Sequence, residues 1–225
     1  MKAKCRNATG LVVLALLMAT MAGCQVFPYL VAQFAPPKKV KALYKPEAKR
    51  KCLVFVDDYY EVLDYEPLKA ELTEQINEQL LKQKIASETV SYQQLLEVTD
   101  ASPHFNRLSV SEVGQKLGVE TVVYVLIDKF SLKDPDASLL WRGNLQVTVR
   151  LVGTKAGRLW PQDRPEGYPV PAVKTPLVDD ASPTYAERIS KTLAARMGDR
   201  IAKLFYDHRV SAEQERQDRA ADFGD

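Results

Sequence analysis

Two adjacent carboxylates, Asp57 and Asp58, follow the apolar run Cys52–Val56, which is typical of a buried strand. Carboxylates at the carboxyl end of a strand can hold Mg²⁺ together with waters and a phosphoryl group. A phosphoryl-transfer site of that kind also needs a phosphoacceptor Asp after a third strand and a later Lys. The long apolar strand here instead continues into Asp128-Lys129-Phe130. A solvated turn is therefore the favoured interpretation, and a metal-dependent enzyme using Asp57 and Asp58 is the weaker alternative.

The other residues suited to chemistry are few and scattered. His104 and His208 are the only two histidines, and Cys52 lies within an apolar strand pattern, so the usual clustered zinc ligands are missing from the sequence. Neither a Gly-x-Ser-x-Gly elbow nor a phosphate-binding glycine loop is present. We expect a protein that is not an enzyme, with no catalytic residues, no metal, no cofactor and no small-molecule substrate. Cys52 is interpreted as a small buried apolar residue.

Cys24 is the residue with the clearest predicted chemistry. Lys2, Lys4 and Arg6 precede an apolar run that ends in Met21-Ala22-Gly23-Cys24, which is the layout of a secretory signal. It resembles a bacterial lipoprotein signal, although Met21 replaces the usual Leu. That resemblance implies that residues 1–23 are removed and that Cys24 carries the lipid that anchors the chain to a membrane. Cleavage after Ala22 and an uncleaved anchor are the alternatives.

Composition places the mature chain among ordinary single-domain proteins. Residues 1–23 hold three basic and no acidic residues, so the formal net charge of +2 becomes −1 without them. A near-neutral chain with interleaved charges gives no indication of nucleic-acid binding. Gln25 is not the Asp that retains many lipoproteins at the inner membrane, and the resemblance therefore implies the periplasmic face of the outer membrane.

Four segments are expected. They are a signal peptide at residues 1–23, a membrane-proximal tether at 24–50, an α/β envelope domain at 51–210 and a disordered tail at 211–225. The tether carries aromatic residues and a lysine series, and it is either docked on the membrane or a solvated linker with a few residues on the domain.

Hydrophobic periodicity predicts an α/β fold: a single domain with a mixed sheet of about five strands, an antiparallel meander, packed helices and a long carboxyl-terminal helix. Ser91 with Gln94 and Ser109 with Glu112 form capping boxes, and Gly118 is suited to end a helix. The expected strands are 52–56, 85–90, 122–132, 139–151 and 158–160, and the expected helices start at 64–67, 91, 109 and 182–183, the last running to about His208.

Six prolines from Pro161 to Pro183 predict a long extended surface loop. An extended proline segment loses little entropy on binding, so this loop is the expected partner surface, through Tyr168, Val170 and Val173.

The arrangement resembles a periplasmic domain shared by the curli-secretion (CsgG) family, penicillin-binding-protein activators and the amino-terminal domain of the Tol translocation protein. The likeness rests on Val113–Glu120 running into Thr121–Ile127, and on Val147–Trp160, where Gly153 and Ala156-Gly157 depart from that group's Asp and Thr-Gly. The resemblance implies a fold and an envelope location rather than a mechanism.

The expected function is therefore non-catalytic binding of another envelope macromolecule, an envelope protein or a cell-wall component that the sequence does not identify. A subunit of an outer-membrane secretion assembly is the alternative. Membrane-spanning hairpins need about 9 to 11 residues per strand and one lipid-facing apolar side. Only Glu120–Leu151 has strands of that length, and Val122–Ile127 is apolar on both sides, as in a buried sheet centre. We expect no pore.

Overall fold

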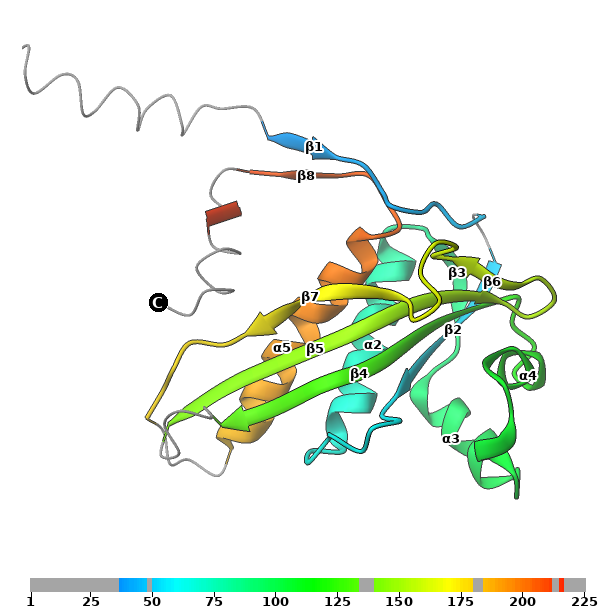
Figure 1. The fold of residues 1–225 in the computed structure, drawn as a ribbon, viewed down its shortest axis with the longest axis horizontal. Helices are drawn as coiled ribbons and strands as arrows, with labels where there is room; N and C mark the ends of the chain where they lie inside the picture. Colours follow the sequence, from blue (N-terminus) through cyan, green and yellow to red (C-terminus); the bar gives the residue numbers. More distant parts are fainter. Residues whose placement is uncertain (1–36, 48–49, 134–139, 180–183, 212–214, 217–225) are drawn as a thin grey trace, which may run out of the picture. The chain divides into compact units, whose positions relative to one another are not determined.

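The computed structural model describes residues 37–47, 50–133, 140–179, 184–211 and 215–216 (Figure 1). The expected signal peptide, Cys24 and most of the expected tail lie outside these residues. Contacts divide the chain into two units, Met1–Lys39 with Arg209–Arg216 and Val40–His208 with Gln217–Asp225. A two-stranded sheet pairs β1 (Lys38–Val40) with β8 (His208–Val210). The α/β fold belongs to the second unit.

A six-stranded mixed sheet forms the centre of the domain. Its order is β3 (Ala86–Thr89), β2 (Arg50–Asp57), β4 (Thr121–Lys133), β5 (Trp141–Gly153) and β6 (Gly157–Trp160), with β7 (Tyr168–Lys174) also paired to β5. β2 is parallel to β3 and β4, whereas the pairings of β5 are antiparallel. The expected α/β class, mixed sheet and antiparallel meander are confirmed.

Four α-helices pack on this sheet in the described part of the chain: α2 (Pro67–Lys82), α3 (Tyr92–Asp100), α4 (Val110–Lys116) and α5 (Tyr185–Lys203). Both expected capping boxes are present, with each serine side chain accepting from the backbone N–H three residues later. Gly118 has a φ of +64°, as expected of a residue that ends a helix in the left-handed region. Among the described residues, no helix is both long and apolar enough to cross a membrane.

The main core lies between the sheet and the helices α2 and α5, which run behind the sheet in Figure 1. The leucines and isoleucine that recur every four residues along α2 are buried, as the sequence predicts: Leu68, Leu72, Ile76 and Leu80. A smaller core on the other face joins β2 and β4 to α3 and α4 through Leu53, Val122, Leu95 and Val113. β4 is therefore covered on both faces near its start, which is why its first residues are continuously apolar.

The segment after β6 corrects the expectation of a long surface loop. Residues 168–174 form β7, an edge strand in which Val170 and Val173 are 2% and 1% exposed. Proline is tolerated on an edge strand because its missing N–H need not pair with a neighbour. Arg200 donates to the carbonyl oxygens of Pro171 and Ala172 at 3.1 and 2.8 Å. The prolines supply no N–H group, and Arg200 already binds two carbonyl oxygens of β7. Both features oppose the pairing of another strand with this edge.

The carboxyl end of the domain also differs from expectation. The last helix ends at Lys203 rather than near His208, and His208 instead starts β8. The carbonyl oxygen of Leu204, at the end of α5, accepts instead from the backbone N–H groups of Leu43 and Tyr44 at 2.8 and 3.2 Å. Part of the segment expected as a tether therefore packs on the end of α5.

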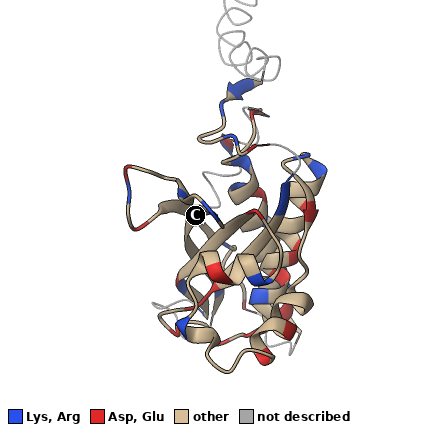
Figure 2. Ribbon diagram, turned by 90° about the vertical axis from the view of Figure 1, so that its right-hand side faces the viewer, with Lys and Arg blue, Asp and Glu red and all other residues tan. Residues whose placement is uncertain are grey.

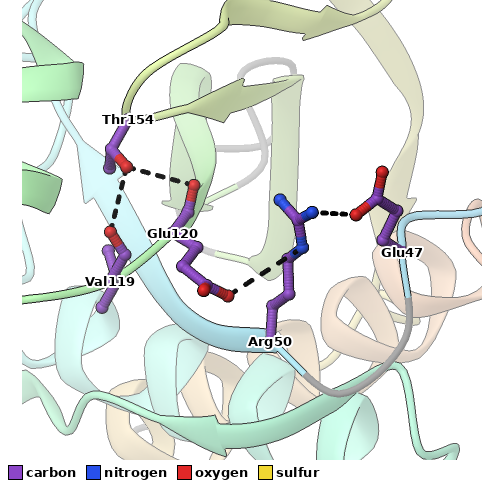
Figure 3. Close-up of polar contacts among 5 residues, drawn as sticks. All are labelled: Glu47, Arg50, Val119, Glu120 and Thr154. Carbon is purple, nitrogen blue, oxygen red and sulfur yellow. Dashed lines mark hydrogen bonds and ion pairs between the residues drawn. The ribbon is translucent and has the colours of Figure 1, made fainter.

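A polar corner joins α4 and β4 to the turn after β5 (Figure 3). The Thr154 hydroxyl donates to the carbonyl oxygens of Val119 and Glu120 at 3.1 and 3.3 Å, and Arg50 pairs with Glu120 at 3.9 Å and with Glu47. A Cβ atom at Gly114 would lie 2.6 Å from the Thr154 methyl group, so only glycine lets α4 approach this closely. The Gly114 to Glu120 stretch thus has a structural role in this domain.

Candidate functional site

One side of the sheet carries polar and aromatic side chains next to the smaller core under α3 and α4, and at the edge of this group Phe55 also meets Phe105 of the short 3₁₀ helix at 6.1 Å. Along β5, odd-numbered residues from Leu145 to Leu151 point into the main core, and even-numbered ones lie on the opposite face. In Figure 1 no helix lies in front of β4, β5 and β7, while α3 and α4 lie towards the β2 side. We call this the open sheet face and define it by six side chains, Phe55, Asp57, Tyr124, Asp128, Thr148 and Arg150.

Tyr124 is at the centre of the open sheet face. Its hydroxyl donates to Asp57 Oδ2 at 2.6 Å, and the Arg150 guanidinium lies 5.3 Å from its ring centroid. The Phe55 ring meets it edge-on at 5.7 Å. Burial, with the hydrogen bond and charge of Asp57, raises the pKa of Tyr124. Tyr124 therefore stays protonated at neutral pH, and at 8% exposure it holds Asp57 in place as a buried hydrogen-bond donor rather than acting as a base.

Asp128 lies four residues after Tyr124 on β4, at an irregularity between Ile127 and Lys129 where the register of β4 against β5 shifts. Its Oδ2 accepts from the Thr148 hydroxyl at 2.8 Å. Desolvation raises the pKa of Asp128, against smaller lowering contributions from the Thr148 hydrogen bond and the Arg150 charge. The folded domain thus disfavours the Asp128 carboxylate more than the unfolded chain does.

That pKa direction predicts the pH dependence of Asp128→Asn. Because the folded pKa is raised above the unfolded value of about 3.9, the contribution of Asp128 to stability is greatest below that value and declines as pH rises through the folded pKa. Asn keeps an acceptor for Thr148 without the charge, so the variant should be at least as stable as wild type at pH 7, and its advantage should shrink towards pH 4. Thermal melts of both proteins from pH 4 to pH 8 measure this. A stability advantage of Asp128→Asn that grows on acidification would contradict a raised pKa of Asp128.

The turn that follows β2 presents two exposed tyrosines. Tyr59 and Tyr60 are 76% and 58% exposed, and their rings meet edge-on at 5.5 Å. The Asp58 carboxylate accepts from the N–H groups of Val62 and Leu63 at 2.9 and 3.0 Å. The backbone carbonyl oxygen of Asp58 accepts from the N–H group of Glu61, a non-glycine residue with a φ of +52°. Residues 58–63, which we call the tyrosine turn, are thus ordered by their own hydrogen bonds rather than by burial of the rings.

The tyrosine turn adjoins the open sheet face, because Asp57 precedes it directly and Tyr60 is close enough to Tyr124 to raise the pKa of that phenol. Together they form a surface with exposed tyrosine rings at its rim and, on its floor, half-buried polar side chains around the buried Tyr124 ring. Tyrosine offers a large rigid contact area with a polar tip, and it is enriched where proteins bind other molecules. The arrangement is suited to recognition.

The residues predicted from the sequence to do chemistry are held in structural contacts. Asp57 bonds Tyr124 and Asp58 orders the tyrosine turn. Within the described ranges, no three His, Cys, Asp or Glu residues come together as metal ligands. His104 is exposed at the start of a short 3₁₀ turn. Cys52 is buried as expected, and burial raises its thiol pKa to about 12, which leaves it unreactive.

The expected partner residues are placed on β7. Val170 and Val173 point into the main core, and Tyr168 is partly exposed and packs against Trp160 at 5.2 Å. Partner binding by Tyr168, Val170 and Val173 stays a prediction. Of these three side chains, only that of Tyr168 is exposed enough on the folded domain to contact a partner. Cys24 lies outside the described residues. Sequence reasoning did not single out Tyr59, Tyr60, Tyr124 or Arg150, although the Tyr-Tyr pair directly after an acidic pair was a visible signal.

Comparisons with known proteins give structural neighbours only. No protein-family model matches the chain, and no curated protein does. The PelC dodecamer from Paraburkholderia phytofirmans is 12% identical with a TM-score of 0.40, over 76% of this chain and 98% of that one. Lipoprotein GNA1162 from Neisseria meningitidis is 9% identical with a TM-score of 0.41, over 66% and 98%. The hypothetical protein CT253 from Chlamydia trachomatis is 15% identical with a TM-score of 0.37, over 77% and 98%.

One of these neighbours is named a lipoprotein. None of the three is described as a curli-secretion, penicillin-binding-protein-activator or Tol protein, so that finer resemblance stays a prediction. At these identities and TM-scores, no function, partner or assembly is transferred from any of them.

Proposed function

We propose that this chain is a lipid-anchored cell-envelope protein whose non-catalytic α/β domain binds another envelope macromolecule through the tyrosine turn and the open sheet face. The observation that carries the proposal is the exposure of Tyr59 and Tyr60 on a turn whose own hydrogen bonds hold it in one conformation. Binding to a preorganised surface avoids the entropy cost of ordering it.

The direction of β2 supports this use of the turn. β2 starts at Arg50, on the side of the chain that leads back to Cys24, and ends at Asp57 next to the tyrosine turn. Its eight residues span roughly 26 Å at about 3.3 Å per residue. The tyrosine turn therefore lies at the opposite end of β2 from Arg50, the residue at which the chain leading from Cys24 enters the sheet.

The charge distribution agrees with a binding role that is not directed at nucleic acid. Basic and acidic residues are interspersed over the ribbon of the domain in Figure 2. The floor of the site carries both signs, because Asp57 and Asp128 lie near Arg150. A surface of this kind does not attract a polyanion.

Cross-linking in the intact envelope tests the proposal. A photo-activatable phenylalanine analogue is placed at Tyr60 in the full chain, and the matched control is the same analogue at Leu81, an exposed apolar residue on α2. We expect a defined cross-linked product from position 60 and none from position 81. Equal products from both positions, or none from position 60, would contradict the proposal.

The anchor is tested separately from the binding surface. Mass spectrometry of the mature amino terminus should find lipid on Cys24, and Cys24→Ser should release the protein from the membrane fraction. An unmodified terminus at Gly23 would remove the anchor from the proposal while leaving the binding surface intact.

A further inference from the structure

We propose that the tyrosine turn binds a cationic segment of a protein partner, in which Lys or Arg side chains lie over the rings of Tyr59 and Tyr60. The inference rests on the proposed function and adds the chemistry of the partner. Its starting point is the exposed pair of rings, 76% and 58% accessible and 5.5 Å apart. A cation within about 6 Å of an aromatic face is attracted by the ring quadrupole.

Cations already lie over other aromatic rings of this domain, at 4.8 to 5.5 Å from the ring centroid. The pairs are Arg188 over Tyr185, Arg150 over Tyr124, Arg164 over Tyr168 and Lys133 over Trp141. In the part of the chain that the structure describes, no Lys or Arg lies over Tyr59 or Tyr60. These two rings therefore remain available to a cation from another molecule.

The negative charge around the two rings favours a positively charged partner. Residues 57–66 contain five acidic residues and three tyrosines, and no Lys or Arg occurs from Cys52 to Leu68. Glu66 is paired with Lys69 at 3.3 Å, but Glu61 and Asp64 are exposed and have no ion-pair partner among the described residues. An incoming Lys or Arg would gain from both carboxylates, whereas an acidic segment would be repelled.

Asp58 adds a further carboxylate to this group, and no ion pair joins it to a cation among the described residues. Its carboxylate accepts from two backbone N–H groups, which satisfies the oxygens without supplying a positive side chain. The nearest cation of the open sheet face, Arg150, is engaged with the Tyr124 ring and donates to the Glu166 carbonyl oxygen at 2.9 Å. The rim of the site is thus acidic and aromatic, which is complementary to a Lys- or Arg-bearing segment rather than to a neutral or acidic one.

Binding of three fluorescein-labelled peptides to the full chain in detergent micelles tests this inference. Each has twelve residues, with Ser alternating with Lys, Gln or Glu, and anisotropy is measured at 50 and 500 mM salt. We expect only the Lys peptide to bind, with an affinity that falls as salt rises. Equal binding of the Gln or Glu peptide, or no binding of the Lys peptide at low salt, would overturn the inference.

Variants identify the groups responsible. The double change of Tyr59 and Tyr60 to Leu keeps apolar area but removes the ring faces, so it should weaken binding by about 4- to 25-fold, at roughly 2- to 5-fold per ring. The double change to Phe should retain binding. Glu61→Gln with Asp64→Asn should weaken binding several-fold and flatten its salt dependence, while Glu78→Gln on α2, also an exposed acidic residue, should change nothing. Full binding by the Leu double variant would overturn the cation–ring contact.

The two proposals can fail separately. If the Tyr60 cross-link captures a partner whose linked peptide lacks Lys and Arg, the inference fails and the proposed function stands. If position 60 gives no defined product and the Lys peptide does not bind, both fail. Thermal melts of each variant establish that the fold is retained, so a loss of binding reports on the surface itself.

Discussion

Leu193→Asp should abolish cooperative folding of the domain. Leu193 is 0% exposed in the middle of α5, on the face that packs against the sheet. Removing a buried leucine side chain costs about 2 to 5 kcal/mol, and burying a carboxylate without a partner adds several more. The sum is comparable with the roughly 5 to 15 kcal/mol by which most domains are stable. Circular dichroism of the full chain should show no thermal unfolding transition.

Asp57→Asn is the contrasting change, because Asn keeps an oxygen that can accept from Tyr124. We expect a change of less than about 1 kcal/mol, in the range usual for partly exposed sites. A Leu193→Asp variant that melts like wild type would contradict the position of α5 in the core. Stabilisation by Mg²⁺ that disappears in Asp57→Asn would instead favour the metal-dependent alternative for Asp57 and Asp58.

The elements that could be predicted from the sequence are those whose local signals agree with their tertiary environment. Leu68 and Ile76 recur at helical spacing and face the main core, and Ser91 and Ser109 form the caps that their spacing indicates. The continuous apolar run at the start of β4 is covered by helices on both faces, as expected. In these places propensity, period and burial all favour the same structure.

β7 shows where local signals mislead. Prolines exclude helix and central strand, which makes a loop the natural interpretation, but an edge strand is compatible with the same residues. Val170 and Val173 are buried because a bulge opposite β5 lets both face the core although they are three residues apart. Spacing alone gives no sign of this, because a bulge breaks the two-residue period on which strand predictions rely.

The candidate site was harder to predict than the fold, because its residues lie on different strands and become neighbours only through the register in which β2, β4 and β5 pair. Asp57 and Asp58 were correctly placed at the end of a strand, yet their neighbours Tyr124 and Arg150 lie on other strands. Alternation along β5 indicates that Arg150 and Thr148 face away from the core, but not that this face lacks a helix. Which part of a sheet stays open depends on where α3 and α4 pack, and no periodicity in β5 carries that information.

Gly143→Val should destabilise the domain by more than about 3 kcal/mol, beyond the usual cost of an added core methylene. A Cβ atom at Gly143 would lie 2.3 Å from Ile189 Cγ2 and 2.9 Å from Leu193 Cδ1, so α5 touches β5 directly at this residue. Backbone adjustment is restricted because Gly143 N–H donates to the Thr175 hydroxyl at 2.8 Å and its carbonyl oxygen accepts from Thr175 N–H at 2.9 Å. Denaturant unfolding of the full chain gives the free-energy difference.

Two further variants separate a steric cause from a general intolerance of β5 to substitution. Gly153→Ala, at the far end of the same strand, adds a Cβ that meets its neighbours at 3.4 Å, and it should cost less than about 1 kcal/mol. Adding Ile189→Ala to Gly143→Val removes the methyl group in the closest contact, so the double variant should be more stable than the sum of the two single losses. Additive losses would contradict the direct contact between β5 and α5, because residues that do not share a contact show no coupling.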